Sequence, residues 1–202
     1  MADFCTVADV ANFLQIEIAA DDASCLRAIA EATAAIKNHC HQEIELVSNE
    51  TITLDCAGGT KLFLPELPVQ SVAEVVEDDE ILTVDDDYKL GQWGILHRVD
   101  DEWASGIQII EITYTHGYAT PLPDDVVSVC VRAASRAYQM GLKTAATDGI
   151  AGIQSLSLGD YAITYSAEAT GGAGEGTMGA SGARMLLMSE KDMLNKYRYV
   201  AQ

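Results

Sequence analysis

Within its first 141 residues the hydrophobic period of this chain changes from helix to strand and back to helix, which favours a helical framework interrupted by strands. Residues 6–15 and 22–40 carry apolar side chains at helical spacing. Between residues 43 and 116, apolar and polar residues alternate over short runs, which predicts small antiparallel strands. The helical period returns at residues 124–141, where we expect Gly141 to end the helix. The sequence therefore predicts an α+β fold: a helical core, near 6–15, 22–40 and 124–141, with an inserted small antiparallel β region at 43–116.

The last third of the sequence predicts a hairpin and a separate C-terminal arm. Apolar residues alternate on both sides of Gly159-Asp160, which predicts a β-hairpin near 153–166. A glycine-rich run follows, and a short amphipathic helix begins at Ser189. We therefore divide the chain into a body, residues 1–168, and a flexible glycine-rich linker with a C-terminal docking arm, residues 169–202. So short a helix needs a surface to fold against, either its own body or a partner.

The charge of the chain excludes two classes of partner. Its 12 lysines and arginines stand against 31 aspartates and glutamates, giving a formal net charge of −19. Such a chain repels DNA phosphates and anionic membranes. Between Lys61 and Lys89 the chain has no basic residue and nine acidic ones: Glu66, Glu74, Glu77, Asp78, Asp79, Glu80, Asp85, Asp86 and Asp87. The C-terminal segment is mildly basic, which favours contact with an acidic surface. The alternative is that the basic tail and the acidic body are both simply solvated.

Cysteine usage and hydropathy point to assembly in a cytoplasm. No run of about 18 apolar residues is present, and the first residues lack the pattern of a secretory signal. The dispersed cysteines form no C-x-x-C pair, so we expect reduced thiols packed as small apolar side chains. These cysteines are Cys5, Cys25, Cys40, Cys56 and Cys130.

No cluster in the sequence makes a convincing metal or catalytic site. The residues of His39-Cys40-His41 are adjacent, so a helix would point them in different directions, and we expect Cys40 in the core. The run Asp85-Asp86-Asp87 lacks the alternating ligands of a calcium loop. His116 could be a general base, but no nucleophile can be assigned to it, and a turn histidine is the better interpretation. We also interpret Trp93 and Trp103 as core residues rather than a ligand platform. The sequence predicts no cofactor.

An ordered set of short segments resembles a known family. The segments, in chain order, are Ile36–Cys40, Leu62–Pro65, Pro68–Val72, Asp87-Tyr88, Gly94–Arg98 with Trp103, Ile112–Tyr118, Pro123–Val126 and Met193–Arg198. Together they are similar to the head-to-tail adaptor (connector) proteins of long-tailed double-stranded DNA bacteriophages, over nearly the whole chain. The long acidic insert is less typical of the shortest members.

The resemblance implies a structural virion protein and not an enzyme. Such a subunit forms a homo-oligomeric ring, typically a dodecamer, in the neck of the virion. The ring lies under the portal protein after genome packaging, meets a stopper or tail-completion protein, and lets DNA pass during ejection without binding it. Assembly takes place in the host cytoplasm. The alternatives are another phage assembly or ligand- or peptide-binding module and, less favoured, a metal-dependent enzyme.

Two sets of site residues follow from the resemblance. The candidate portal-docking arm consists of Met185, Leu186, Leu187, Met193, Leu194, Tyr197 and Arg198. The acidic loops that face neighbouring subunits or the tail contain Glu77, Asp78, Asp79, Glu80, Asp85, Asp86 and Asp87.

Overall fold

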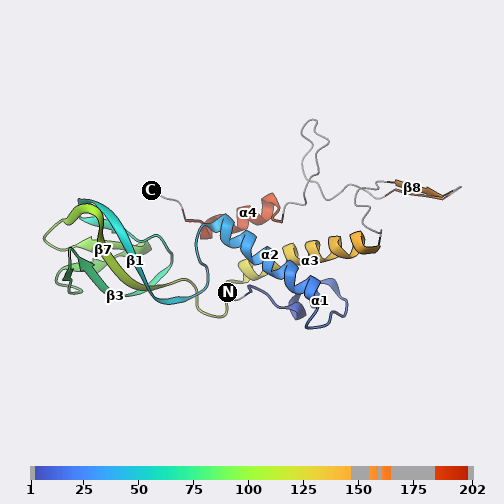
Figure 1. The fold of residues 1–202 in the computed structure, drawn as a ribbon, viewed down its shortest axis with the longest axis horizontal. Helices are drawn as coiled ribbons and strands as arrows, with labels where there is room; N and C mark the ends of the chain where they lie inside the picture. The colour runs from blue at the N-terminus through green and yellow to red at the C-terminus, as the bar shows by residue number, and fades with distance from the viewer. Residues whose placement is uncertain (1–2, 147–154, 159–160, 165–184, 200–202) are drawn as a thin grey trace, which may run out of the picture. The chain divides into compact units, whose positions relative to one another are not determined.

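The computed structural model of the chain is a mixed α+β structure, as the sequence predicts (Figure 1). It describes residues 3–146, 155–158, 161–164 and 185–199. The chain divides into two compact units. The helical unit comprises Met1–Thr33 and Val129–Leu187, and the sheet unit comprises Ala34–Ser128 and Met188–Gln202. The division proposed from the sequence, at residue 168, falls outside the described residues and stays a prediction.

Three helices build the helical framework close to the expected positions. They are α1 (Val7–Leu14), α2 (Ala23–Cys40) and α3 (Asp124–Ala146). Helix α1 begins with a capping box, because the Thr6 hydroxyl accepts a bond from the Asp9 backbone N–H at 3.2 Å. In return the Asp9 carboxylate accepts from the Thr6 N–H at 2.8 Å. These paired bonds satisfy N–H groups at a helix start that would otherwise lack partners.

The N-terminal segment of the helical unit is held against both long helices. The Phe4 N–H donates to the Thr33 hydroxyl at 3.2 Å, and the Cys5 sulfur lies 3.3 Å from that of Cys130. Cys130 Sγ is also 3.7 Å from the Thr33 hydroxyl. All five cysteines are buried and free, so the prediction of packed, reduced thiols is confirmed.

Helix α3 passes through Gly141 and ends at Ala146, so the prediction that Gly141 stops the helix is wrong. Glycine ends a helix when it takes a left-handed conformation, and Gly141 does not take it. A methyl group at Gly141 would meet no atom within 4 Å. Here glycine is merely a tolerated residue of a long helix.

The sheet unit holds two antiparallel sheets around one core, where the sequence predicted a single β region. The larger has the order β1-β7-β3-β4, with β1 (Val47–Gly59), β3 (Val69–Glu77), β4 (Glu80–Ile81) and β7 (Trp103–His116). The smaller has the order β2-β6-β5, with β2 (Lys61–Phe63), β5 (Tyr88–Leu90) and β6 (Ile95–Arg98). Side chains of both sheets fill the core, among them Val75, Ile112 and Tyr114 from the larger and Leu62 and Leu96 from the smaller.

The predicted hairpin near residues 153–166 is confirmed. Strands β8 (Ser155–Leu158) and β9 (Tyr161–Thr164) pair antiparallel, with Leu158 opposite Tyr161. The glycine-rich run predicted as a linker lies outside the described residues. Within the part of the chain that the structure describes, no helix is long and apolar enough to cross a membrane.

Gly117 closes the end of β7 in a conformation that only glycine adopts freely. Its φ is +87°, and a methyl group there would overlap the backbone carbonyl of Glu45. We therefore expect Gly117→Ala to lower the free energy of unfolding by more than about 2 kcal/mol, since the strain and the overlap add.

The matched control for this change is Gly141→Ala. It places the same methyl group on a helical glycine with open space around it, and should raise stability by about 0.5–1 kcal/mol. Urea unfolding followed by circular dichroism measures both. Equal effects of the two changes would contradict the assigned backbone conformations.

Candidate functional site

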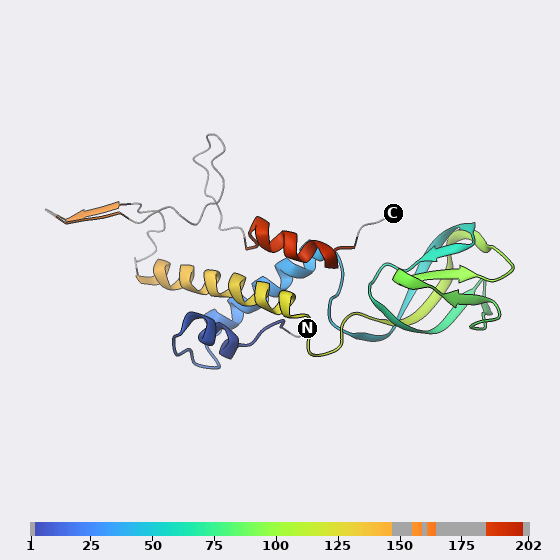
Figure 2. The same ribbon diagram turned by 180° about the vertical axis from the view of Figure 1, so that it is seen from behind.

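The C-terminal segment folds onto its own chain. Helix α4 (Met188–Leu194) and the 3₁₀ turn η2 (Asn195–Tyr197) lie beside the C-terminal end of α2 in both opposite views (Figures 1 and 2). Leu194 is fully buried, and the Tyr199 N–H donates to the Cys40 carbonyl at 2.8 Å. Of the two surfaces that the sequence left open for this helix, its own body is the one it uses.

His39 and Cys40 serve this contact. The His39 ring Nε2 lies 3.3 Å from the Lys191 carbonyl and 3.3 Å from the Asn195 side-chain oxygen. Cys40 is fully buried, as predicted, and burial raises the pKa of its thiol to about 11. The Cys40 sulfur also lies 4.0 Å from the Leu194 carbonyl. Both residues therefore contact α4.

The same segment reaches the first turn of α3. The Tyr197 hydroxyl donates to Asp125 at 3.4 Å, and the Lys196 ammonium forms an ion pair with the same carboxylate. The hydrogen bond from Lys196 lowers the pKa of Asp125 and raises that of Lys196. Because both side chains are partly exposed, water and salt weaken this pair, and buried Leu194 and Tyr197 supply most of the attachment.

The seven predicted portal-docking residues divide by exposure. Leu186, Leu194 and Tyr197 are buried within the chain, whereas Leu187 and Arg198 are exposed. Met185 and Met193 are intermediate, and the Met185 carbonyl accepts a bond from Arg136 at 2.9 Å. The buried members have no surface to offer a partner. Portal docking through the exposed members stays a prediction.

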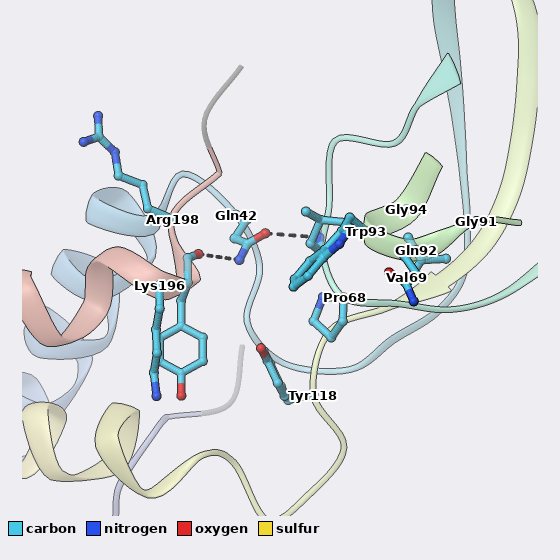
Figure 3. A pocket seen from close by; sticks show the side chains of 12 residues that line it. Gln42, Pro68, Val69, Gly91, Gln92, Trp93, Gly94, Tyr118, Lys196 and Arg198 are labelled. Atoms are coloured by element: carbon cyan, nitrogen blue, oxygen red, sulfur yellow. Dashed lines mark hydrogen bonds between the residues drawn. The ribbon is translucent and has the colours of Figure 1, made fainter. Parts of the chain in front are cut away.

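A pocket of about 290 Å³ opens in the sheet unit beside η2 (Figure 3). Leu67, Pro68 and Val69 give it an apolar lining, and Trp93 and Tyr118 add aromatic rings. Lys196 and Arg198 also border it, although the Arg198 guanidinium points away from Trp93. We call this the Trp93 pocket.

Buried Gln42 ties the two sides of the Trp93 pocket together. Its amide nitrogen donates to the Tyr197 carbonyl, and its amide oxygen accepts from the Leu67 N–H at 3.1 Å (Figure 3). A buried amide with both ends bonded fixes its surroundings firmly. Nothing in the sequence marked Gln42 or Tyr118 as part of a site.

Trp93 lies at the surface, so its prediction as a core residue is wrong, while that for Trp103 is confirmed. Trp93 is 81% exposed and Trp103 only 2%. Trp93 has a left-handed backbone (φ 63°), and a methyl group at the next residue, Gly94, would lie 2.6 Å from Leu67 Cδ2. This tight turn directs the indole away from the core. A tryptophan so exposed is a common anchor of protein interfaces.

The predicted acidic loops contain two structural acids. Glu77 is buried, accepts from the Ala104 N–H at 2.7 Å, and pairs with Arg98 at 3.1 Å. Asp87 accepts from the Thr83 N–H at 2.7 Å. The remaining predicted acids are exposed: Asp78, Asp79, Glu80, Asp85 and Asp86. The Asp87 side chain is also 42% exposed. Whether any of these acids faces a neighbour stays a prediction.

His116 is a buried structural residue of β7. Its side chain is inaccessible, its Nε2 lies 2.6 Å from Glu50 Oε2, and its ring packs 5.0 Å from that of Tyr114. This closed arrangement agrees with its interpretation as a turn histidine. Among the described residues, no group of three or more histidines, cysteines or acids is placed to hold a metal ion.

Comparisons with known proteins agree with the resemblance seen in the sequence. Several solved structures share the fold. A chain titled "Neck of native GTA particle computed with C12 symmetry" matches with a TM-score of 0.52 and 15% identity, covering 97% of this chain and 89% of that one. A second, "Neck of empty GTA particle computed with C6 symmetry", matches with a TM-score of 0.52 and 16% identity, covering 96% and 90%.

A third solved chain, "Virion of native gene transfer agent (GTA) particle", has a TM-score of 0.51 and 16% identity over 97% of this chain and 90% of that one. No curated protein sequence matches the chain. A family model described as "Head completion protein" matches residues 3–132, which is well over half of the sequence. The chain therefore belongs to the head completion protein family.

Proposed function

We propose that this protein is a structural, non-enzymatic subunit of the head-to-tail junction of a tailed phage or phage-like particle. The observation that carries the proposal is the family match over residues 3–132. The matched stretch includes α1, α2, both sheets and the start of α3. The likeness in fold to neck chains of gene transfer agent particles supports the same position in a particle.

The subunit forms a closed ring beneath the portal protein, with a channel for DNA and a lower face for a stopper or tail-completion protein. One related neck structure is titled with C12 symmetry, which supports a ring of twelve copies, and another is titled with C6 symmetry. The ring assembles in the host cytoplasm and remains in the neck of the virion.

The charge of the subunit fits a channel that DNA passes without binding. With a net charge of −19, the chain has few cations with which to replace phosphate counterions. Exposed carboxylates, such as those of Asp85 and Asp86, would keep a duplex away from the wall. In this proposal, docking to the portal uses the exposed members of the predicted arm, Leu187 and Arg198.

Deletion of the gene tests the proposed function. In a producing strain that lacks the chain, we expect DNA-filled heads and separate tails, because the junction between them is missing. Electron microscopy of lysates counts the two, and the wild-type chain supplied in trans should restore joined particles. Normal numbers of tailed particles without the chain would contradict a role at the junction.

A further inference from the structure

Cys5 and Cys130 form a pair of thiols inside the helical unit that the proposed function does not use. Their sulfur atoms lie 3.3 Å apart, although the residues are 125 positions apart in the sequence. We propose that this pair is a redox site, at which a peroxide oxidises the two thiols to a disulfide that ties the N-terminal segment to α3. The inference goes beyond the proposed function and does not depend on it.

The two sulfurs are placed so that a disulfide closes with little movement. A disulfide bond is about 2.0 Å long, so the sulfurs need to approach each other by only about 1 Å. Cys130 lies on α3, whereas Cys5 precedes α1 and belongs to no helix or strand. The backbone at Cys5 can therefore shift by this amount without breaking a helical hydrogen bond.

The hydrogen bonds around Cys130 make its sulfur the nucleophile of the pair. This sulfur accepts from the Cys5 thiol at 3.3 Å, and the Thr33 hydroxyl lies 3.7 Å from it. Because the Thr33 oxygen accepts from the Phe4 N–H at 3.2 Å, the hydroxyl proton is left to donate to Cys130. The bond between the two thiols lowers the pKa of Cys130 and raises the pKa of Cys5. The thiolate is the form of cysteine that reacts with oxidants.

Burial and charge favour a small, neutral oxidant. Cys130 is fully buried and Cys5 is 6% exposed. The carboxylates of Asp9 and Asp3 are close enough for their charge to raise the pKa of Cys5. A bulky anionic oxidant such as glutathione disulfide is therefore excluded and repelled, whereas hydrogen peroxide is uncharged and close to water in size. Hydrogen peroxide reaches the sulfurs when the segment before α1 opens locally, as chain ends do at low cost in free energy.

The reaction balances with one molecule of hydrogen peroxide. The Cys130 thiolate attacks a peroxide oxygen, the O–O bond breaks, and the leaving hydroxide takes up the proton that Cys130 released, which gives water. The Cys5 sulfur then attacks the sulfenic acid of Cys130. An S–S bond forms, the S–O bond breaks, and the hydroxyl leaves with the Cys5 proton as a second water. Two thiols lose two electrons in all, and a thiol reductant returns them by exchange.

Thiol counting on the purified full-length chain tests the site. The protein is treated with hydrogen peroxide, denatured and alkylated with iodoacetamide. We expect the number of alkylated cysteines to fall from five to three, because two sulfurs are joined, and a peptide digest to contain Cys5 linked to Cys130. The oxidised protein should melt at least about 5 °C above the reduced protein, because the cross-link constrains a long loop of the unfolded chain. Dithiothreitol should reverse both changes.

Serine variants separate this pair from the other thiols. Cys5→Ser and Cys130→Ser each remove one sulfur of the pair, so each should abolish the cross-link and the rise in melting temperature that peroxide causes. Cys25→Ser is the matched control, because Cys25 is fully buried in the same unit, and it should retain both effects. The digest of the wild-type chain gives a result even where a serine variant does not fold.

The possible results are distinct. A linked peptide of Cys5 and Cys130 that requires peroxide supports the redox site. Free thiols at both positions after treatment, an oxygen added to one of them without a cross-link, or a cross-link between other cysteines overturns it. The role at the head-to-tail junction is tested separately by deletion of the gene, so a failure of the redox site leaves that role standing.

Discussion

We expect Leu194→Asp to lower the free energy of unfolding by more than about 4 kcal/mol. Leu194 is fully buried where α4 meets the end of α2. The change removes a large apolar side chain, which costs about 2–5 kcal/mol, and it also buries a carboxylate. Urea unfolding followed by circular dichroism measures the difference.

Met188→Asp is the control on the same helix. Met188 is 65% exposed and opens α4, where an added carboxylate favours the helix dipole. We expect a change within about 0.5 kcal/mol of wild type. Equal losses from Leu194→Asp and Met188→Asp would show that α4 does not pack on its own chain.

The burial of Leu194 and Tyr197 changes the expected effect of removing the C-terminal segment. If residues 185–202 were an arm that folds only on a portal, their removal would leave a folded body that no longer joins portals. In the structure the same removal uncovers the end of α2, including Cys40, and leaves Gln42 without its bond to the Tyr197 carbonyl. We therefore expect the truncated chain to be destabilised, so single substitutions at Arg198 are the better probe of docking.

Loss of the Arg98 charge should lower the free energy of unfolding nearly as much as Leu194→Asp does. The side chains of Arg98 and Glu77 are 10% and 9% exposed, and their charged atoms lie 3.1 Å apart. Arg98 also lies over the Trp103 ring, 5.5 Å from its centroid. Arg98→Met leaves the Glu77 carboxylate buried without its partner, and we expect a loss of about 3–5 kcal/mol in the same unfolding measurement.

A surface pair of the same chemistry provides the control. Arg27 and Glu31 form an ion pair at 2.8 Å on α2, with side chains 81% and 50% exposed. Arg27→Met should cost less than about 0.5 kcal/mol, because water already screens the pair. The double change Glu77→Gln and Arg98→Met should regain part of the loss, since no unpaired charge remains. A loss at Arg98 no larger than at Arg27 would contradict the buried pair.

The sequence predicts this fold well where local chemistry decides it. The entrance of α3 is an example, since Asp124 begins the helix directly after Pro123 and the Val126 N–H bonds to the Pro123 carbonyl. Glu77 is a counterexample, because it was expected in an acidic loop that faces a neighbour, whereas the structure buries it. Its partner Arg98 lies 21 positions away and meets it only once the sheets have formed.

Tertiary contacts decide what the sequence could not predict. The helical spacing of Leu26 with Ile29 and Ile36 predicts that all three are buried, yet Leu26 is 41% exposed, while Cys25 is fully buried. The apolar face of α2 is thus rotated toward Cys25. The exposure of Trp93 could not be predicted from the sequence either. It follows from a tight turn in which Gly94 packs closely against Leu67. The Trp93 pocket forms from segments far apart in the sequence and carries no local motif.

Electron cryomicroscopy of the neck of the assembled particle tests the central claim most directly. The account predicts a closed ring of this chain between the portal and the tail, with the DNA path through its centre. A neck that lacks the chain, or one that holds it as a single copy outside the DNA path, would contradict the account.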